Sequence, residues 1–235
     1  MQPPAQNPTP TDPGTQNPPP TTNPTPNDPT PNEPAPNTDP YVIEYYGDST
    51  IWGWASGTNG GRVATPAPTA FANALPTTPQ NVVRNEGVSG STSCELLEGG
   101  YGSYPTWNNL MQSSDATHVI VNHGINDENE LSEERYRYCL TQIAQIARAN
   151  GKKIVFETPN PVGDDRLVTY VQIMRSVAAA QEPDVPVIDQ HAYLMNYLNG
   201  RSVGEIAPDG VHPNQETYIM KGEYAAQRFM EIFPR

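Results

Sequence analysis

Five short apolar segments constrain the fold of this chain more than any other feature of its sequence. They are rich in β-branched and aromatic residues and begin at Tyr41, Asn81, Thr117, Lys152 and Val185. Each is almost continuously apolar, which is typical of strands buried on both faces of a parallel sheet and not of strands with one face in water. We therefore expect five parallel strands.

Helical patterns lie between these segments. In residues 133–149 apolar side chains recur every three or four positions, which predicts a helix with one face packed on the sheet. Residues 167–180 and the C-terminal segment, where Ala225 and Phe229 share one side, follow the same pattern. Alternating strands and helices imply an α/β fold, a three-layer α/β/α sandwich with a five-stranded parallel sheet. Ligands of such sheets bind at the carboxyl ends of the strands.

The prolines gather in residues 1–40, which consist almost wholly of Pro, Thr, Asn, Gln and Asp and contain no lysine or arginine. Such a segment cannot bury enough apolar surface to offset the conformational entropy that ordering would remove. We expect a disordered Pro/Thr/Asn-rich linker over 1–40, extended enough to act as a tether. A single globular domain is expected over 41–235.

The formal net charge of −13 argues against nucleic acid and anionic membrane surfaces as partners. Binding to either needs clustered lysine and arginine, and no cluster is visible. No apolar run reaches the roughly 18 residues of a membrane span. Because the chain does not begin like a signal peptide, export would depend on a signal removed from this sequence.

Metal sites and cofactors have no support in the sequence. The four histidines show no paired ligand spacing, and the two cysteines form no CxxC pattern, so we expect neither a metal nor a cofactor. Cys94 and Cys139 make an even pair in a chain that we expect to be exported. A disulfide and two buried thiols fit this pair equally well.

Two glycine-containing motifs stand at the ends of expected strands. Gly47-Asp48-Ser49 follows the first strand, where the glycine permits a tight exit and the serine comes to the rim of the sheet. After the second strand, Thr92 and a glutamate three residues later have capping-box spacing, so a helix should begin just after Gly90. A backbone N–H beside a helix start can stabilise negative charge. Each motif, taken alone, also fits an ordinary turn.

Two further motifs complete the set. Residues 124–127 follow the third strand, where Asn126 could present its amide over the edge of the sheet. Asp209 stands three residues before His212, just ahead of the last helix. Histidine is the usual general base near neutral pH, and a carboxylate so placed can fix the orientation of its ring.

All four motifs occur once each and in this order. Together they resemble the SGNH hydrolase family, also called GDSL esterases and lipases, over the whole expected globular domain. The resemblance implies a flavodoxin-like sandwich and a serine esterase. By this resemblance Ser49 is the nucleophile, His212 the base and Asp209 its partner. The N–H groups of Ser49 and Gly90 and the amide of Asn126 would form the oxyanion hole.

The chemistry implied is two-step acyl transfer through an acyl-enzyme, without a cofactor. Three residues beside the motifs are candidates for substrate contact, namely Asp48, Trp52 and His123. The G-x-S-x-G nucleophile elbow of another serine hydrolase fold is absent, as are nucleotide-binding glycine motifs.

The four motifs do not indicate which ester the enzyme hydrolyses. Aromatic residues gather near the serine, and their faces suit sugar rings, although core packing accounts for many aromatics. With the expected tether, they favour a carbohydrate O-acetylesterase acting on polysaccharide or cell-wall acetyl groups, secreted, periplasmic or at a bacterial cell surface. One alternative is a short-chain lipid or aryl esterase, similar to a lysophospholipase or thioesterase. Another is a non-catalytic carbohydrate-binding module. The oligomeric state is left open.

Overall fold

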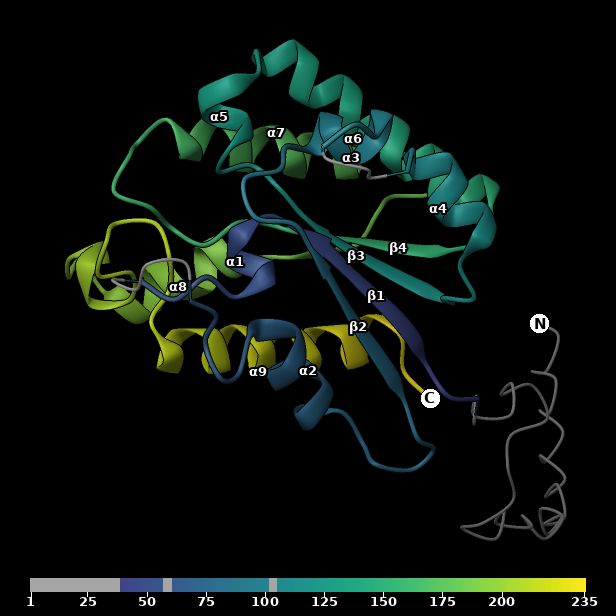
Figure 1. The fold of residues 1–235 in the computed structure, drawn as a ribbon, viewed down its shortest axis with the longest axis horizontal. Coiled ribbons are helices and arrows are strands. Elements are labelled where there is room, and N and C mark those ends of the chain that lie inside the picture. Colours follow the sequence, from purple (N-terminus) through teal and green to yellow (C-terminus); the bar gives the residue numbers. More distant parts are fainter. Residues whose placement is uncertain (1–38, 57–60, 102–104) are drawn as a thin grey trace, which may run out of the picture. The chain divides into compact units, whose positions relative to one another are not determined.

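In the computed structural model, the five apolar segments form one parallel sheet in the order β2-β1-β3-β4-β5 (Figure 1). The five-stranded parallel sheet is therefore confirmed. β5 pairs over only two residues because Pro186 lacks the N–H that a longer ladder would need. The strands are β1 (Val42–Gly47), β2 (Val82–Gly87), β3 (His118–Asn122), β4 (Lys153–Glu157) and β5 (Val187–Ile188).

The structure describes residues 39–56, 61–101 and 105–235. The linker expected over 1–40 lies outside this set apart from its last two residues. The described residues all belong to one structural unit.

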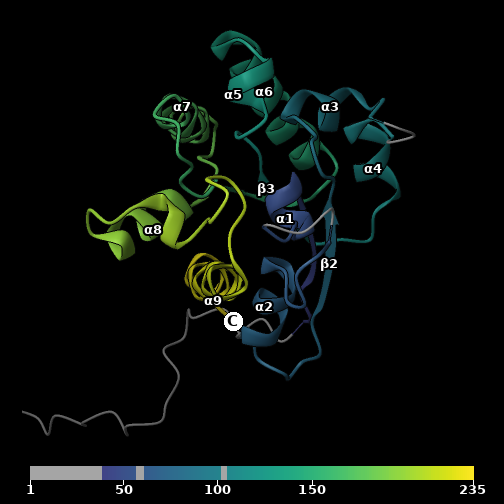
Figure 2. The ribbon, with the colours of Figure 1, turned by 60° about the vertical axis from the view of Figure 1, so that its left-hand side comes forward.

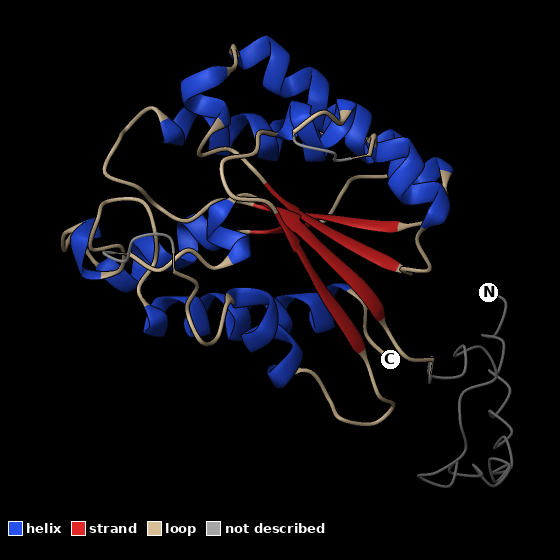
Figure 3. Cartoon of the chain, viewed as in Figure 1, coloured by secondary structure: helices blue, strands red, loops and turns tan. Residues whose placement is uncertain are grey.

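Helices cover both faces of the sheet, as Figures 1 and 2 show, and Figure 3 separates them from the strands by colour. One layer contains α3 (Ser93–Glu98), α4 (Trp107–Ser113), α6 (Glu133–Ala149) and α7 (Leu167–Ala179). The other contains α2 (Ala67–Ala74) and α9 (Gln215–Ile232). The other helical elements are α1 (Ser49–Trp52), α5 (Asp127–Glu130), α8 (Gln190–Leu198) and the 3-10 helix Val203–Glu205. The α/β/α sandwich is confirmed.

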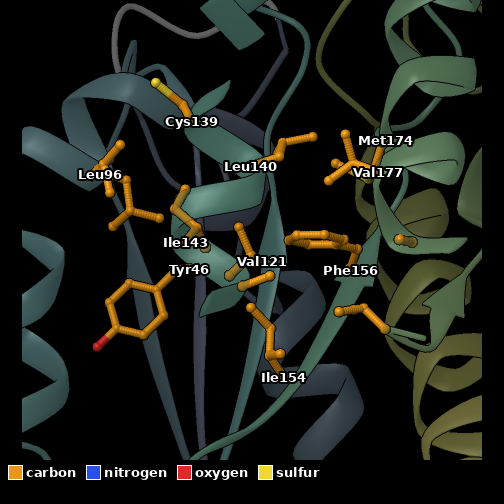
Figure 4. Packing of buried hydrophobic residues seen from close by; sticks show 14 of the residues in the cluster. Tyr46, Leu96, Val121, Cys139, Leu140, Ile143, Ile154, Phe156, Met174 and Val177 are labelled. Carbon is orange, nitrogen blue, oxygen red and sulfur yellow. The ribbon is translucent and has the colours of Figure 1, made fainter. Parts of the chain in front are cut away.

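The core is divided into two layers by the alternation of side chains along each strand. Tyr46, Val121 and Phe156 pack against α3, α6 and α7 (Figure 4). Their neighbours Tyr45 and Ile120 point the opposite way, toward α2 and α9. Because helices cover both faces, the inner strands β1 and β3 are buried at almost every position, which explains their largely apolar sequence. The edge strand β2 is only half-buried and carries Arg84, Asn85 and Glu86.

A disulfide joins Cys94 of α3 to Cys139 of α6, and both cysteines are buried in the first core layer. The bridge ties the helix after β2 to the helix after β3. It closes a loop across 45 positions of sequence. A crosslink of this span removes much of the freedom of the unfolded chain.

The double variant Cys94→Ala/Cys139→Ala should therefore be less stable. Loop-closure entropy for this span corresponds to about 4 kcal/mol of unfolding free energy. Urea unfolding of the variant and of the oxidised wild type measures the difference. Wild type treated with dithiothreitol is the matched control and should unfold near the variant. Equal urea midpoints for oxidised wild type and variant would contradict a stabilising bridge.

Candidate active site

Three neighbouring strands end at the same level of the sheet. Gly47, the last residue of β1, is paired with Gly87 of β2 and with Asn122 of β3. The loops that follow these residues carry the first three sequence motifs. The parallel register thus brings the motifs to one edge, which is where α/β sheets bind ligands.

Gly47 and Gly87 let the short helix α1 fold back against the end of the sheet. A Cβ at Gly47 would lie 2.3 Å from Cγ1 of Ile51 and 2.5 Å from the carbonyl oxygen of Asn122. A Cβ at Gly87 would lie 2.3 Å from the backbone nitrogen of Trp52. These contacts are too short for any side chain, so both glycines serve close backbone approach.

Ser49 is the first residue of α1, and Asp48 caps this helix. Oδ1 of Asp48 accepts hydrogen bonds from the backbone N–H and the hydroxyl of Thr50, each at 2.8 Å. Burial raises the pKa of Asp48, although the bonds from Thr50 act against the rise. The first N–H groups of a helix have no partner inside it. The N–H of Ser49 is therefore available to a ligand at this edge.

A hydrogen-bonded chain connects Ser49, His212 and Asp209. Oγ of Ser49 lies 2.9 Å from Nε2 of His212, and Nδ1 of His212 lies 2.9 Å from Oδ2 of Asp209. Since a carboxylate only accepts, this network assigns the ring proton to Nδ1 and leaves Nε2 to accept from the serine. The arrangement is that of a nucleophile, a base and a residue that orients the base.

Asp209 is held in its charged form by the loop around it. Oδ1 accepts from the backbone N–H of His212 at 2.7 Å and of Val211 at 3.0 Å. Burial alone would raise the pKa of Asp209, but hydrogen bonds from the His212 backbone, the His212 ring and the Val211 backbone outweigh it and lower the pKa. An ionised carboxylate therefore faces the imidazole near neutral pH.

Gly90 and Asn126 lie beside each other across two loops. Gly90 has a φ of +83°, which favours glycine, and Nδ2 of Asn126 donates to the carbonyl of Ser91 at 2.9 Å. A side-chain amide has two hydrogens, so Asn126 keeps one for a substrate oxygen. Within the described part of the chain, no hydrogen bond uses the N–H of Gly90. Both groups suit an oxyanion hole.

Two of the expected substrate contacts are buried side chains. Asp48 is 0% exposed and His123 is 1% exposed. Nε2 of His123 lies 3.3 Å from Oγ of Ser91, and burial lowers the pKa of His123 to about 3, which keeps the ring neutral. Trp52 is only half-buried and stays a candidate for substrate contact.

Further residues at the site have no motif to identify them. The ring of Trp54 lies 5.8 Å from the ring of His212, and Oγ of Ser56 accepts from the backbone N–H of Asp209 at 3.1 Å. Asn160 donates to the carbonyl of Val211 at 3.1 Å. The position of Asn160 just beyond β4, at the carboxyl edge of the sheet, is the one available signal in the sequence.

The described residues contain neither a metal-binding cluster nor a helix that could span a membrane. No group of three or more His, Cys, Asp or Glu side chains is arranged there to hold a metal ion. No helix in 39–56, 61–101 and 105–235 combines the length and apolar character of a membrane span.

The sequence profile of the GDSL-like lipase/acylhydrolase family matches residues 45–218, which include all four motifs. The chain belongs to this family. As a GDSL family member it is an ester-hydrolysing serine hydrolase, which sets aside the alternative of a non-catalytic carbohydrate-binding module. No curated protein is a significant match to the chain.

Several solved structures share the fold. An acetylxylan esterase from Geobacillus stearothermophilus is 18% identical, with a TM-score of 0.64 over 83% of this chain and 94% of that one. A carbohydrate acetylesterase family member from Sinorhizobium meliloti is 16% identical, with a TM-score of 0.63 over 83% of this chain and 100% of that one. A protein described as lipolytic and of the G-D-S-L family, from Desulfitobacterium hafniense, is 20% identical, with a TM-score of 0.61 over 82% and 99%.

Replacing Asn126 by alanine should lower turnover with little change in folding. Loss of one oxyanion-hole donor costs about 10²- to 10³-fold in kcat, because the donor acts mainly on the charge that develops in the transition state. Steady-state hydrolysis of p-nitrophenyl acetate measures the loss.

Asn129→Ala is the matched control. Asn129 also donates from Nδ2 to a backbone carbonyl, that of Ile125 at 3.2 Å, but it is exposed. The control should keep kcat within about twofold, well below the loss expected for a donor to the oxyanion. Equal kcat for the two variants would show that Asn126 is no oxyanion donor.

Proposed function

We propose that this GDSL enzyme is a carbohydrate O-acetylesterase that works through an acyl-enzyme formed on Ser49. The observation that carries the proposal is the hydrogen-bonded chain from Ser49 through His212 to Asp209, next to an indole surface. The chain supports the reaction, and the indole surface supports the substrate class.

The first half of the reaction forms the acyl-enzyme. His212 accepts the hydroxyl proton of Ser49 at Nε2 while Oγ attacks the ester carbonyl carbon. The tetrahedral intermediate collapses, the bond from carbon to the alcohol oxygen breaks, and the imidazolium returns its proton to the leaving alcohol. Asp209 stabilises the imidazolium and remains ionised throughout.

The second half releases the acid. Water takes the place of the alcohol, gives a proton to His212 and attacks the acyl carbon, and the collapse of this intermediate restores the hydroxyl of Ser49. In both halves the carbonyl oxygen gains negative charge. The N–H groups of Ser49 and Gly90 and the amide of Asn126 are the donors that we assign to it.

The substrate class is inferred from two tryptophans beside the base. Trp54 lies 5.8 Å from the ring of His212, and Trp52 lies 5.9 Å from Trp54, so the two indoles form a row of rings that starts at the imidazole. Both are half-buried, and the Arg62 guanidinium packs 5.4 Å from the centre of Trp52. Aromatic rings next to a guanidinium suit a sugar, which has apolar C–H faces and hydroxyl groups.

The names of similar structures support the same class, since two of them are an acetylxylan esterase and a carbohydrate acetylesterase family member. The disulfide supports an oxidising compartment, where such bonds persist. We accordingly propose a secreted, periplasmic or surface-tethered enzyme, with residues 1–40 as the tether. Its proposed substrate is the acetyl group of a polysaccharide or cell wall.

A short-chain lipid or aryl esterase, similar to a lysophospholipase or thioesterase, is the second candidate. It is favoured by the lipase/acylhydrolase name of the family and by the lipolytic protein from Desulfitobacterium hafniense. The two candidates differ in what the enzyme binds beyond the ester, which is a sugar in one and an acyl chain or an aryl group in the other.

We expect acetate release from O-acetylated xylooligosaccharides with a kcat/KM above that for p-nitrophenyl acetate. Trp52→Ala should raise KM for the oligosaccharide about tenfold, equivalent to about 1.4 kcal/mol of lost stacking, and leave p-nitrophenyl acetate nearly unchanged. Acetate release and p-nitrophenol absorbance are the two measurements.

Tyr138→Ala is the control, because Tyr138 is an aromatic residue on α6 that is 50% exposed. It should change neither KM. A chain-length series of p-nitrophenyl esters completes the comparison. Preference for acyl chains of eight carbons or more, without acetate release from the oligosaccharide, would reject the acetylesterase.

A further inference from the structure

A buried lysine lies beneath the candidate active site. Lys221 is on the face of α9 that packs against the sheet, and its side chain is 0% exposed. Nζ of Lys221 donates to Oδ1 of Asn160 at 2.9 Å, and Asn160 is also fully buried. Removing an ammonium group from water costs several kcal/mol, which its partners must offset. A lysine whose burial is this unfavourable, so close to the candidate active site, is a candidate for a function there.

Asn160 connects the lysine to the loop that carries the histidine. Its Nδ2 donates to the carbonyl oxygen of Val211 at 3.1 Å and to that of Pro161 at 3.1 Å. The Val211 carbonyl belongs to the same peptide unit as the N–H of His212. That N–H donates to Asp209 at 2.7 Å. Asn160 and Asp209 therefore hold the two ends of one peptide group and fix its plane.

The plane of this peptide sets the direction of the catalytic ring. The Cα of His212 is the next atom of the chain, so a rotation of the peptide would swing the ring away from Ser49. The contact between Nε2 and Oγ is 2.9 Å. A displacement of about 1 Å at a reacting group can cost about 10²-fold in rate.

Lys221 also interacts electrostatically with the turn that carries the nucleophile. Burial lowers the pKa of Lys221, and the carboxyl groups of Glu157 and Asp48 act against the fall. Asp48 is the cap of α1, whose first residue is Ser49. One buried side chain thus acts on the loop of the base by a hydrogen-bonded path and on the turn of the nucleophile by an electrostatic one.

We propose that Lys221 and Asn160 are positioning residues, which fix the peptide that carries the ring of His212. The assignment rests on the proposed function, because it takes His212 as the general base. Asn160 acts on the base by direct contact with its loop, and Lys221 acts by fixing the amide orientation of Asn160. Neither side chain touches the reacting atoms.

Asn160→Asp separates this role from a purely structural one. The aspartate keeps an oxygen for the Lys221 ammonium but places a second oxygen, in place of the N–H donor, against the Val211 carbonyl. At pH 8 we expect a folded variant whose kcat on p-nitrophenyl acetate is about 10- to 100-fold below wild type. KM should stay within about twofold, since substrate binding is not touched.

Gln181→Ala is the matched control for loss of a buried amide. Gln181 is 9% exposed and donates to the Val177 carbonyl at 3.3 Å, away from the site. It should lower the thermal midpoint and keep the wild-type kcat. Asn160→Ser, which is too short to reach both Lys221 and Val211, repeats the test without a new charge and should show the same fall in kcat.

Two results would overturn the proposal. The first is a folded Asn160→Asp or Asn160→Ser variant with wild-type kcat. The second is an equal fall in kcat for Gln181→Ala, because the effect would then be general destabilisation. Hydrolysis by the wild type distinguishes failure of the positioning role from failure of the proposed function. If the wild type turns over normally while the Asn160 variants are unaffected, only the positioning role fails, whereas an inactive wild type would reject the proposed function itself.

Discussion

The level at which β2, β1 and β3 end is the constraint on which the site depends. Gly47 stands in register with Gly87 and Asn122, and the inner strands β1 and β3 are covered on both faces. A slip of one residue would turn every side chain of a strand to the opposite face, so the two core layers lock this register. The loops with the candidate nucleophile and oxyanion donors therefore start from fixed points, and only the His212 loop comes from elsewhere.

The His212 loop is held by polar contacts instead of strand pairing. Asp209 accepts from two N–H groups of the loop, and Asn160 holds the carbonyl of Val211 from below. Because Asn160 is bound in turn by Lys221 of α9, the second helix layer contributes to the site as well as to the core. Such buried polar contacts stabilise one geometry of the base more than they stabilise the fold as a whole.

Much of this arrangement could be predicted from the sequence where a periodic pattern repeats. The helix expected over 133–149 is α6 at the same bounds, and the capping box at Thr92 starts α3. The four-residue α1 has too few positions for a period, and His123 is buried next to Ser91, which is 32 residues away in the sequence. Lys221 stands one turn before Ala225 on an apolar helix face, and a lysine on such a face is a signal in the sequence. Its connection to Val211 runs through Asn160, which is 51 residues away from Val211 and could not be predicted.

The central claim is that Ser49, activated by His212, is the nucleophile of this GDSL esterase. Intact-mass spectrometry after treatment with a fluorophosphonate, followed by peptide mapping, tests it most directly. The account predicts one adduct, on Ser49, that forms on the folded protein and is absent from Ser49→Ala, with labelling strongly slowed in His212→Ala. An adduct on a different serine, or equal labelling of wild type and Ser49→Ala, would contradict it.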